Sequence, residues 1–493
     1  MDPNSLAPDR GLNFPWNSVI TRRHDRDVAT GWAWGGTMDD GGGGYQAEEI
    51  LATCLFRIYR TAGGDANDVN ARRLASRFLL YVKVHADASL GPAPITPTPT
   101  AIPYATALMT ADASVSSFMG NPGGALGKVI RWSFEKQGLY QPSGAPTPVT
   151  SPGAPPAVDV YIDDGRHGEY PYTPDFWENT DIWNRQAADG GLAHQTPLLG
   201  VTNYVYVRLH NRGGQQANNV IVNAYHCRPS TGLLWPSDWQ AMTTPQLIVP
   251  GGVPAGGSVV VGPFDWTPTV AGHECLLVYA NATGDLSNAD ALSGLPCAAG
   301  PTPHWWLVPF DNNLGQRNVA PVAGGGGIKG LVGSLQGRHF WANNPYDHAA
   351  QVQLEVVMPE FLSERGWRLG FLNPGGAKFT LGPLASREVV LSVQPGRDFA
   401  PGDVPLDVGA TMIKIRTLLD GIIVGGMSYQ VDPALRRPPR ERPRRARREE
   451  SEELAEKLLE SIGLADREVE SVRLRKVTID IEVEDEEEDE DSD

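Results

Sequence analysis

The chain has 493 residues, more than one ordinary domain holds, so we expect two to four domains. Its 55 glycines and 41 prolines exceed average usage and separate short apolar runs, as the turns of all-β domains require. The net charge of −17 comes mostly from the final EVEDEEEDEDSD, so nucleic-acid binding by the mildly acidic body is not expected. No apolar run is long enough for a membrane span, and the N-terminus carries no export signal.

The first 140 residues carry the helical signals. A first helix is expected to end at Gly63-Gly64, and its apolar residues recur on one face: Ile50, Leu51, Cys54, Leu55 and Ile58. A second helix is expected over 69–86, with four residues turned inward: Leu74, Phe78, Leu79 and Val82.

Two proline-rich stretches interrupt the helical pattern. The first, 91–103, cannot continue a helix because proline lacks the backbone donor, and two shorter helices are expected at 104–113 and 124–137. The second, 141–156, is typical of an extended, semi-stiff linker. We therefore expect a helical domain over 1–140.

Beyond the linker the apolar period changes to two, which predicts strands. The stretch TNYVYVRLHNRG alternates, with Val205, Val207 and Leu209 on one face. Further strands are divided by Gly, Pro and Asn turns: NNVIVNAYHC (218–227), GSVVVGPFDW (257–266) and HECLLVYANAT (273–283). Short strands at such intervals predict an antiparallel β-sandwich over 157–322.

A second, smaller β-sandwich is expected over 328–432, after a hinge formed by GGGG at 324–327. Its predicted strands are QVQLEVVMP (351–359), REVVLSVQP (387–395), TMIKIRTLL (411–419) and GIIVGGMSYQV (421–431). Asp420-Gly421 is expected to form a tight hairpin turn, because this dipeptide tolerates positive φ.

The last segment, 433–493, is interpreted as a charged tail. A basic block begins at Arg436 and ends at Arg448, a short helix is expected from Ser451, and an alternating stretch follows at 472–484. The tail either docks on a partner through its charges or stays solvated while its basic and acidic blocks neutralise each other. The predicted fold class is therefore multidomain α + all-β, with a helical lobe, two antiparallel β-sandwiches and a charged tail.

Three segments of the helical region form an ordered set: DGGGGY (40–45) leading into a helix, YATALMTADAS (104–114) and KVIRWSFEKQGL (128–139). In this order they resemble the helical C-terminal lobe of thermolysin-type zinc peptidases, above all the fungalysin branch. The resemblance covers roughly residues 10–140. In that family the loop leads to a histidine that helps to stabilise the transition state, and Tyr45 stands at that position here.

The zinc-binding half of that family has no counterpart in this sequence. The motif His-Glu-x-x-His holds the metal and supplies the general base, and none of the 10 histidines begins it. Zinc lowers the pKa of its bound water from about 15.7 to roughly 7, an effect that a tyrosine cannot replace. We expect no peptide hydrolysis by the family's mechanism, and we assign no catalytic residue, no metal ligand and no cofactor. A truncated gene product, or a form that has shed its catalytic half, would explain this arrangement.

The middle segment contains DIWNR (181–185), HQTPLLGVTNYVYVRLHNRG (194–213) and DNNLGQRNV (311–319). These motifs resemble the CARDB-type sandwich, an immunoglobulin-like module of bacterial extracellular enzymes. The resemblance implies a binding or spacing role and no fixed active site.

Cys227 and Cys275 have three interpretations. His226-Cys227 closes one predicted strand and His273-x-Cys275 opens another, so these side chains could bind zinc if the strand ends meet. The two thiols could instead form a disulfide, or remain buried thiols, which we favour. Cys54, on an apolar helix face, is also expected to be a buried thiol.

Three other stretches have both a binding and a structural interpretation, and we favour the structural one each time. VYIDDGRHGEY (160–170) could hold calcium or perform acid–base chemistry, but its Asp-Gly sequence is typical of a surface turn. RRHDRD (22–27) could bind an anion, but a solvated, self-paired charge cluster explains it. Trp305-Trp306 and GWAWGG (31–36) could stack on sugars, but core packing explains them better.

The sequence favours a non-catalytic binding or scaffolding protein whose sandwich modules contact a protein or a cell surface. One alternative is the non-catalytic half of a split zinc metalloendopeptidase, whose partner chain would supply His-Glu-x-x-His. Another is a carbohydrate-binding surface protein. The resemblances imply an extracellular location, while the residues themselves assign neither compartment, ligand nor oligomeric state.

Overall fold

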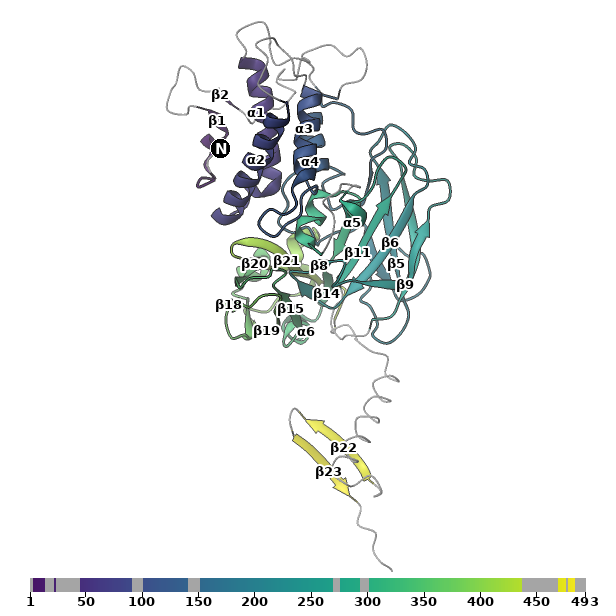
Figure 1. Cartoon of the computed structure of the whole chain (residues 1–493). Helices are drawn as coiled ribbons and strands as arrows, with labels where there is room; N and C mark the ends of the chain where they lie inside the picture. The colour runs from purple at the N-terminus through teal and green to yellow at the C-terminus, as the bar shows by residue number, and fades with distance from the viewer. Residues whose placement is uncertain are drawn as a thin grey trace, which may run out of the picture.

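The structure is a computed structural model, and it describes residues 3–13, 22–23, 45–90, 101–140, 151–268, 275–292, 301–436, 469–475 and 478–483. The chain combines a few helices with many sheets, nearly all antiparallel (Figure 1). The predicted fold class, multidomain α + all-β, is confirmed. Within the described ranges, no helix is both long and apolar enough to cross a bilayer.

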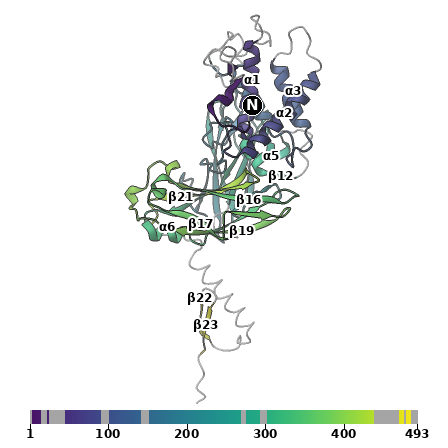
Figure 2. The ribbon, with the colours of Figure 1, turned by 90° about the vertical axis from the view of Figure 1, so that its left-hand side faces the viewer.

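Four helices gather at one end of the molecule (Figures 1 and 2): α1 (Tyr45–Tyr59), α2 (Val69–Leu90), α3 (Ala101–Ser114) and α4 (Gly127–Glu135). The predicted inward face of α2 is confirmed, because its four residues are all at most 5% exposed. On α1, Ile50, Cys54 and Ile58 are likewise buried. A π-helical turn, η3 (Arg60–Gly64), ends α1 at Gly63, whose φ of 123° disfavours any side chain.

The first β-sandwich packs two sheets face to face. One sheet has the order β10–β5–β3, with β4 also paired to β5: β3 (Val160–Tyr161), β4 (Ile182–Arg185), β5 (Asn203–Asn211) and β10 (Ser258–Trp266). The other has the order β13–β11–β6–β9: β6 (Ile221–Cys227), β9 (Gln240–Ile248), β11 (Cys275–Asn281) and β13 (Leu314–Arg317). Val205, Val207 and Leu209 are fully buried between the sheets, as their alternation predicts.

The second β-sandwich has a five-stranded and a four-stranded sheet. The first follows the order β14–β21–β20–β16–β18: β14 (Val319–Ala323), β16 (Ala350–Val357), β18 (Lys378–Leu381), β20 (Met412–Leu419) and β21 (Ile422–Asp432). The second follows β17–β19–β15–β7: β7 (Ser230–Thr231), β15 (His339–Asn343), β17 (Arg368–Asn373) and β19 (Ser386–Gln394). β14 and β7 lie earlier in the chain than the other strands, and both pair in parallel.

Short elements complete the described fold. They are η1 (Pro8–Gly11), β1 (Leu12–Asn13), β2 (Arg22–Arg23), β8 (Leu234–Trp235), α5 (Asn288–Ala291), β12 (Thr302–Pro303), η4 (His304–Trp306), η5 (Val308–Phe310), α6 (Gly327–Leu335), α7 (Glu360–Ser363), η6 (Pro401–Asp403) and η7 (Gly409–Thr411). The alternating stretch of the tail forms a hairpin of β22 (Val469–Arg475) and β23 (Thr478–Val483), drawn apart from the body in both views (Figures 1 and 2). The helix expected from Ser451 and the basic block beyond Arg436 lie outside the described residues.

Two glycine-containing segments behave differently from each other. Asp420 and Gly421 join β20 to β21 with φ values of 48° and 88°, so the predicted hairpin turn is confirmed. The run 324–327 is closely packed rather than an open hinge. A Cβ on Gly325 would meet the Pro433 carbonyl oxygen, and one on Gly326 would meet that of Arg436. These glycines therefore permit close backbone approach beside the end of β21.

A charged cluster joins the two sandwiches. Lys414 Nζ lies 2.9 Å from Asp175 Oδ2 and 2.7 Å from Glu178 Oε2, and Arg416 Nε lies 2.7 Å from Asp175 Oδ1. Between them the fully buried Trp177 indole donates to Ser428 Oγ over 3.1 Å. The sandwiches are thus held by specific polar contacts as well as by apolar packing.

Gly421→Ala should destabilise the protein by at least about 1 kcal/mol, because it places a side chain at positive φ and against the carboxylate of Asp68. Unfolding in urea, followed by tryptophan fluorescence, measures the loss. Gly382→Ala is the control, since nothing lies within 4 Å of the added Cβ. Equal midpoints for the two variants would contradict the assignment of this turn.

Candidate functional site

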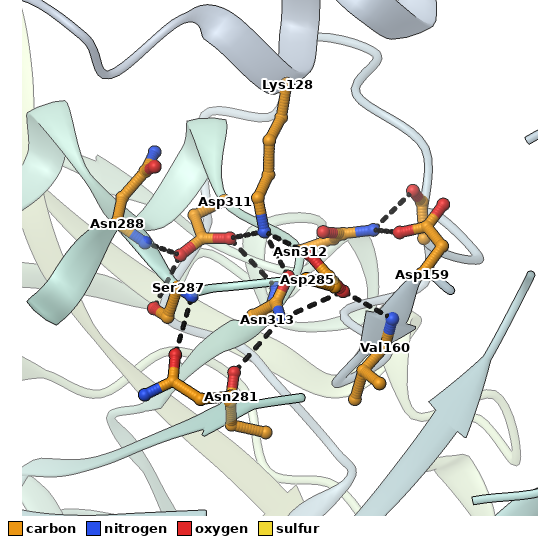
Figure 3. A network of polar contacts seen from close by, with 12 residues as sticks. Lys128, Asp159, Val160, Asn281, Asp285, Ser287, Asn288, Asp311, Asn312 and Asn313 are labelled. Carbon is orange, nitrogen blue, oxygen red and sulfur yellow. Dashed lines mark hydrogen bonds and ion pairs between the residues drawn. The ribbon is translucent and has the colours of Figure 1, made fainter. Parts of the chain in front are cut away.

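Helix α4 presents a charged and aromatic face to the first sandwich. Lys128, Arg131, Trp132 and Glu135 are spaced so that they share one side of the helix. Figure 3 shows the Lys128 side chain reaching from the helix into acids and amides on loops of the sandwich. The helical lobe and the sandwich therefore meet through buried charge.

The Lys128 ammonium group has three hydrogen-bond acceptors, one for each of its donors. It lies 2.8 Å from Asp311 Oδ1 and 3.1 Å from Asp285 Oδ1, and it also donates to Asn313 Oδ1. Burial alone would lower the pKa of Lys128, but the two carboxylates outweigh it and hold that pKa above its ordinary value. The lysine therefore stays charged at neutral pH.

Both acids of this group have their remaining acceptor positions filled. Asp311 Oδ2 accepts from Ser287 Oγ and from the backbone N–H of Asn288, each over 2.7 Å. Asp285 Oδ2 accepts from the backbone N–H of Val160 over 2.7 Å and from Asn313 Nδ2 over 3.1 Å (Figure 3). Carboxylates so saturated with donors are fixed in place and are poor candidates for proton transfer.

A second ion group runs parallel to the first. Arg212, just after β5, places Nε 2.7 Å from Asp159 Oδ2 and Nη1 2.6 Å from Glu135 Oε1 on α4. Asp159 Oδ1 also accepts from Asn312 Nδ2 over 2.8 Å. Burial raises the pKa of the Glu135 carboxyl, against the opposing effect of Arg212. α4 is thus fixed to the sandwich at two positions. At one, Lys128 of the helix contacts acids of the sandwich; at the other, Arg212 of the sandwich contacts Glu135 of the helix.

A cavity of about 830 Å³ lies beside these ion groups, between α3, α4 and the loop after β11. Its wall is largely apolar or aromatic and includes Met109, Ala113, Trp132, Tyr170 and Leu286. The Trp132 and Tyr170 rings contact each other edge to face, with centroids 5.9 Å apart. The volume falls in the range of small-molecule sites, which are often found where domains meet.

The start of α4 is positioned by a buried acid of α3. Asp112 accepts from the backbone N–H groups of Gly124 and Leu126, over 3.1 and 2.9 Å, just ahead of the helix. Burial raises the pKa of Asp112 from 3.8 to about 7, although these donors oppose the rise. This carboxyl couples two of the walls of the cavity.

The alternatives for the two sandwich cysteines can now be compared with the geometry. Cys227 and Cys275 lie opposite each other on β6 and β11, both buried, and in the described part of the chain no disulfide joins them. His226 lies on the opposite face of β6, against the Trp266 ring, because neighbouring strand residues alternate in direction. His226 and Cys227 therefore cannot face one ion, and among the described residues no group of three His, Cys, Asp or Glu side chains could hold a metal. His273 lies outside the described residues.

Several structural interpretations are confirmed. Cys54 is buried, and burial raises its pKa to about 12. Trp305 and Trp306 are at most 5% exposed. In the 160–170 stretch, Asp163 Oδ1 accepts from the backbone N–H groups of Gly165 and His167, as a turn requires. The loop 40–44, the side chain of Tyr45, GWAWGG and most of RRHDRD lie outside the described residues.

The polar groups beside the cavity are not indicated by any motif of the sequence, from which no site residue is assigned. In the sequence, Lys128, Arg131 and Glu135 belong to the segment that resembles a peptidase helix, and Asp311 to Asn313 belong to a sandwich motif. Charged residues on the inward face of a short helix were the available signal. The acid partners of Lys128 lie 157 and 183 residues away and the Arg212 partner of Glu135 lies 77 residues away, so spacing could not identify them.

Comparison with known proteins adds little. No protein-family profile and no curated protein sequence matches the chain. The CARDB domain of a Pyrococcus furiosus protein, solved with di-metal ions, is 12% identical, with 28% of this chain and 81% of that chain covered and a TM-score of 0.16. Red sea bream transglutaminase is 13% identical (48% and 30% covered, TM-score 0.13), and the CupB6 tip adhesin of Pseudomonas aeruginosa is 10% identical (56% and 99% covered, TM-score 0.15).

These are weak likenesses to a CARDB domain and to other β-rich proteins. The resemblance of the helical lobe to fungalysin-type peptidases finds no family or curated sequence to support it and depends on the quoted motifs alone.

Lys128→Met should destabilise the protein by about 3–5 kcal/mol, because Asp285 and Asp311 would remain buried without their cation. Lys83→Met, which breaks an exposed pair with Asp87, should cost less than about 1 kcal/mol. Urea unfolding of both variants tests the difference. Similar losses in the free energy of unfolding for the two variants would contradict a stabilising role for the ion group at α4.

The raised pKa of Asp112 predicts a pH-dependent stability. The folded state binds this proton more tightly than the unfolded state, so its contribution is complete below about pH 4 and is lost as pH rises to about 7. Asp112→Asn should therefore remove part of the fall in unfolding free energy between these limits, on the order of 1–4 kcal/mol. Asp347→Asn, at a 97% exposed side chain, is the control. Identical pH profiles for Asp112→Asn and the unaltered protein would refute this.

Proposed function

We propose that this chain is a non-catalytic binding protein, whose cavity between the helical lobe and the first sandwich takes a small, largely apolar ligand. The two β-sandwiches would act as the frame and as interaction modules toward a protein or cell surface. In this proposal the helical lobe descends from a fungalysin-like architecture and the first sandwich from a CARDB-type module, as the quoted motifs suggest.

The observation that carries the proposal is the cavity of about 830 Å³, with Met109, Trp132, Tyr170 and Leu286 in its wall. Concave, mostly apolar sites of this size at the meeting point of two lobes are typical of ligand pockets. Its walls come from α3, α4 and a sandwich loop; the buried ion groups fix α4 on the sandwich, and Asp112 of α3 accepts from the backbone ahead of α4. A preorganised pocket loses little conformational freedom on binding.

The polar groups beside the cavity favour binding over catalysis. The carboxylates of Asp159 and Asp285 each receive hydrogen bonds on both oxygens, and the Lys128 ammonium group has three acceptors. A general base needs a free lone pair within reach of the substrate, and a nucleophile needs such a base beside it. The described groups serve to hold the walls instead.

A neutral fluorescent probe tests the pocket. N-phenyl-1-naphthylamine should bind with a stoichiometry near one and gain fluorescence on leaving water. Thr110→Trp adds bulk at an exposed position in the pocket wall and should weaken this binding at least about tenfold. Val84→Trp, on an exposed position of α2 away from the pocket, should leave the affinity unchanged.

Two results would overturn the proposal. The first is that the unaltered chain does not bind the probe, or that Thr110→Trp binds it with the same affinity as the unaltered chain. The second is zinc-dependent casein digestion by the purified chain, with zinc bound at one equivalent, which would restore the peptidase interpretation.

A further inference from the structure

The cavity wall contains five charged side chains in the described part of the chain: Lys128, Arg131, Asp159, Arg212 and Asp285. Four of them belong to the two ion groups described above. In each group one cation is paired with two acids: Lys128 with Asp285 and Asp311, and Arg212 with Asp159 and Glu135. Both cations are thus committed to acids of the protein, and these groups offer a ligand no free cation.

Arg131 is the exception. Among the described residues it makes no ion pair; its guanidinium hydrogen-bonds the side chain of Tyr140 and donates a long bond of 3.4 Å from Nη2 to the Ala154 carbonyl oxygen. Its Nη1 is buried and has no acceptor. The guanidinium lies over the ring of Tyr140, which orients it without neutralising its charge.

The acid placed best to neutralise Arg131 is already used. Glu135 lies one helical turn further along α4, but its Oε1 and Oε2 accept from Arg212 over 2.6 and 3.3 Å. Burial lowers the pKa of Arg131, and the favourable interactions with Tyr140 and Glu135 do not offset this desolvation of the charged form. An anion entering the cavity would satisfy a donor that the protein leaves without an acceptor.

We propose that the pocket binds an apolar acid, with its single anionic head on the Arg131 guanidinium and its body against Met109, Trp132 and Leu286. This rests on the proposed function and adds the chemical class of the ligand. A guanidinium is suited to this task because it offers paired donors to a carboxylate or sulfonate.

Other ligand classes fit the same wall less well. A cation would find the carboxylates of Asp159 and Asp285 already committed. A sugar needs many hydrogen-bonding partners, but the Thr106 and Ser114 hydroxyls on α3 already donate to carbonyls of their own helix. The apolar wall and the lone cation together match an amphiphile that carries one negative charge.

Two probes with the same aromatic body distinguish the contribution of an anionic head to binding from that of the apolar body. 8-Anilino-1-naphthalenesulfonate carries an anionic sulfonate, whereas N-phenyl-1-naphthylamine is its neutral counterpart. In the full chain, Arg131→Gln should weaken binding of the sulfonate about tenfold or more, because one charge-assisted pair is lost. The neutral probe should lose less than about threefold. The affinity of Arg131→Lys for the sulfonate should lie between that of the unaltered chain and that of Arg131→Gln, since lysine keeps the charge but not the paired donors.

Controls make the outcomes distinct. Arg77→Gln, at an exposed arginine of α2, should not change either affinity, and thermal unfolding of each variant reports whether it folds. Equal losses for both probes, or no loss for the sulfonate in folded Arg131→Gln, would overturn the apolar-acid inference while the pocket stands. Failure of both probes to bind the unaltered chain would instead overturn the proposed function itself.

Discussion

The placement of α4 depends on the Lys128 ammonium group. It is the point at which a helix from one lobe meets two acids from separate loops of the first sandwich, Asp285 and Asp311. A buried ion group of this kind contributes less to net stability than to uniqueness, because each partner is costly without the others. One geometry satisfies all of them, so the helix has one position. Arg131 and Trp132 follow on the same face of α4, so their positions are fixed as well, and both line the cavity.

In the proposed site, the two ion groups beside the cavity support its walls, and Arg131 recognises the ligand. Asp159, Glu135 and Arg212 satisfy one another, as do Lys128 and its acids, so they hold the walls apart without presenting reactive atoms. Arg131, in contrast, keeps a buried Nη1 that has no acceptor in the described structure. In the proposed site, a rigid apolar wall with one cation that has an open donor would discriminate by the sign of the ligand's charge more than by its detailed shape.

Local patterns predicted much of the architecture, and long-range pairings set the limit. The apolar face of α2 and the alternation of β5 follow from periodicity, and the Asp420-Gly421 turn follows from the positive φ that it needs. The contact between Lys128 and Asp311 could not be found in this way, because it depends on how two lobes dock. The two-residue β7 is too short to show any period. The glycines at 324–327 were interpreted as a hinge because composition does not reveal what packs against them.

The exchange of strands between the two sandwiches affects how such a chain can evolve. β7 and β14 lie before the glycine run, yet they complete the edges of sheets built mostly from residues after it. If recombination moved residues 328–432 alone into another gene, β15 and β21 would each lose a neighbour and expose unpaired backbone donors and acceptors. Such edges invite aggregation, so a recombinant carrying only this part should be selected against. The two sandwiches are therefore best inherited as one cassette, despite the linker-like glycines between them.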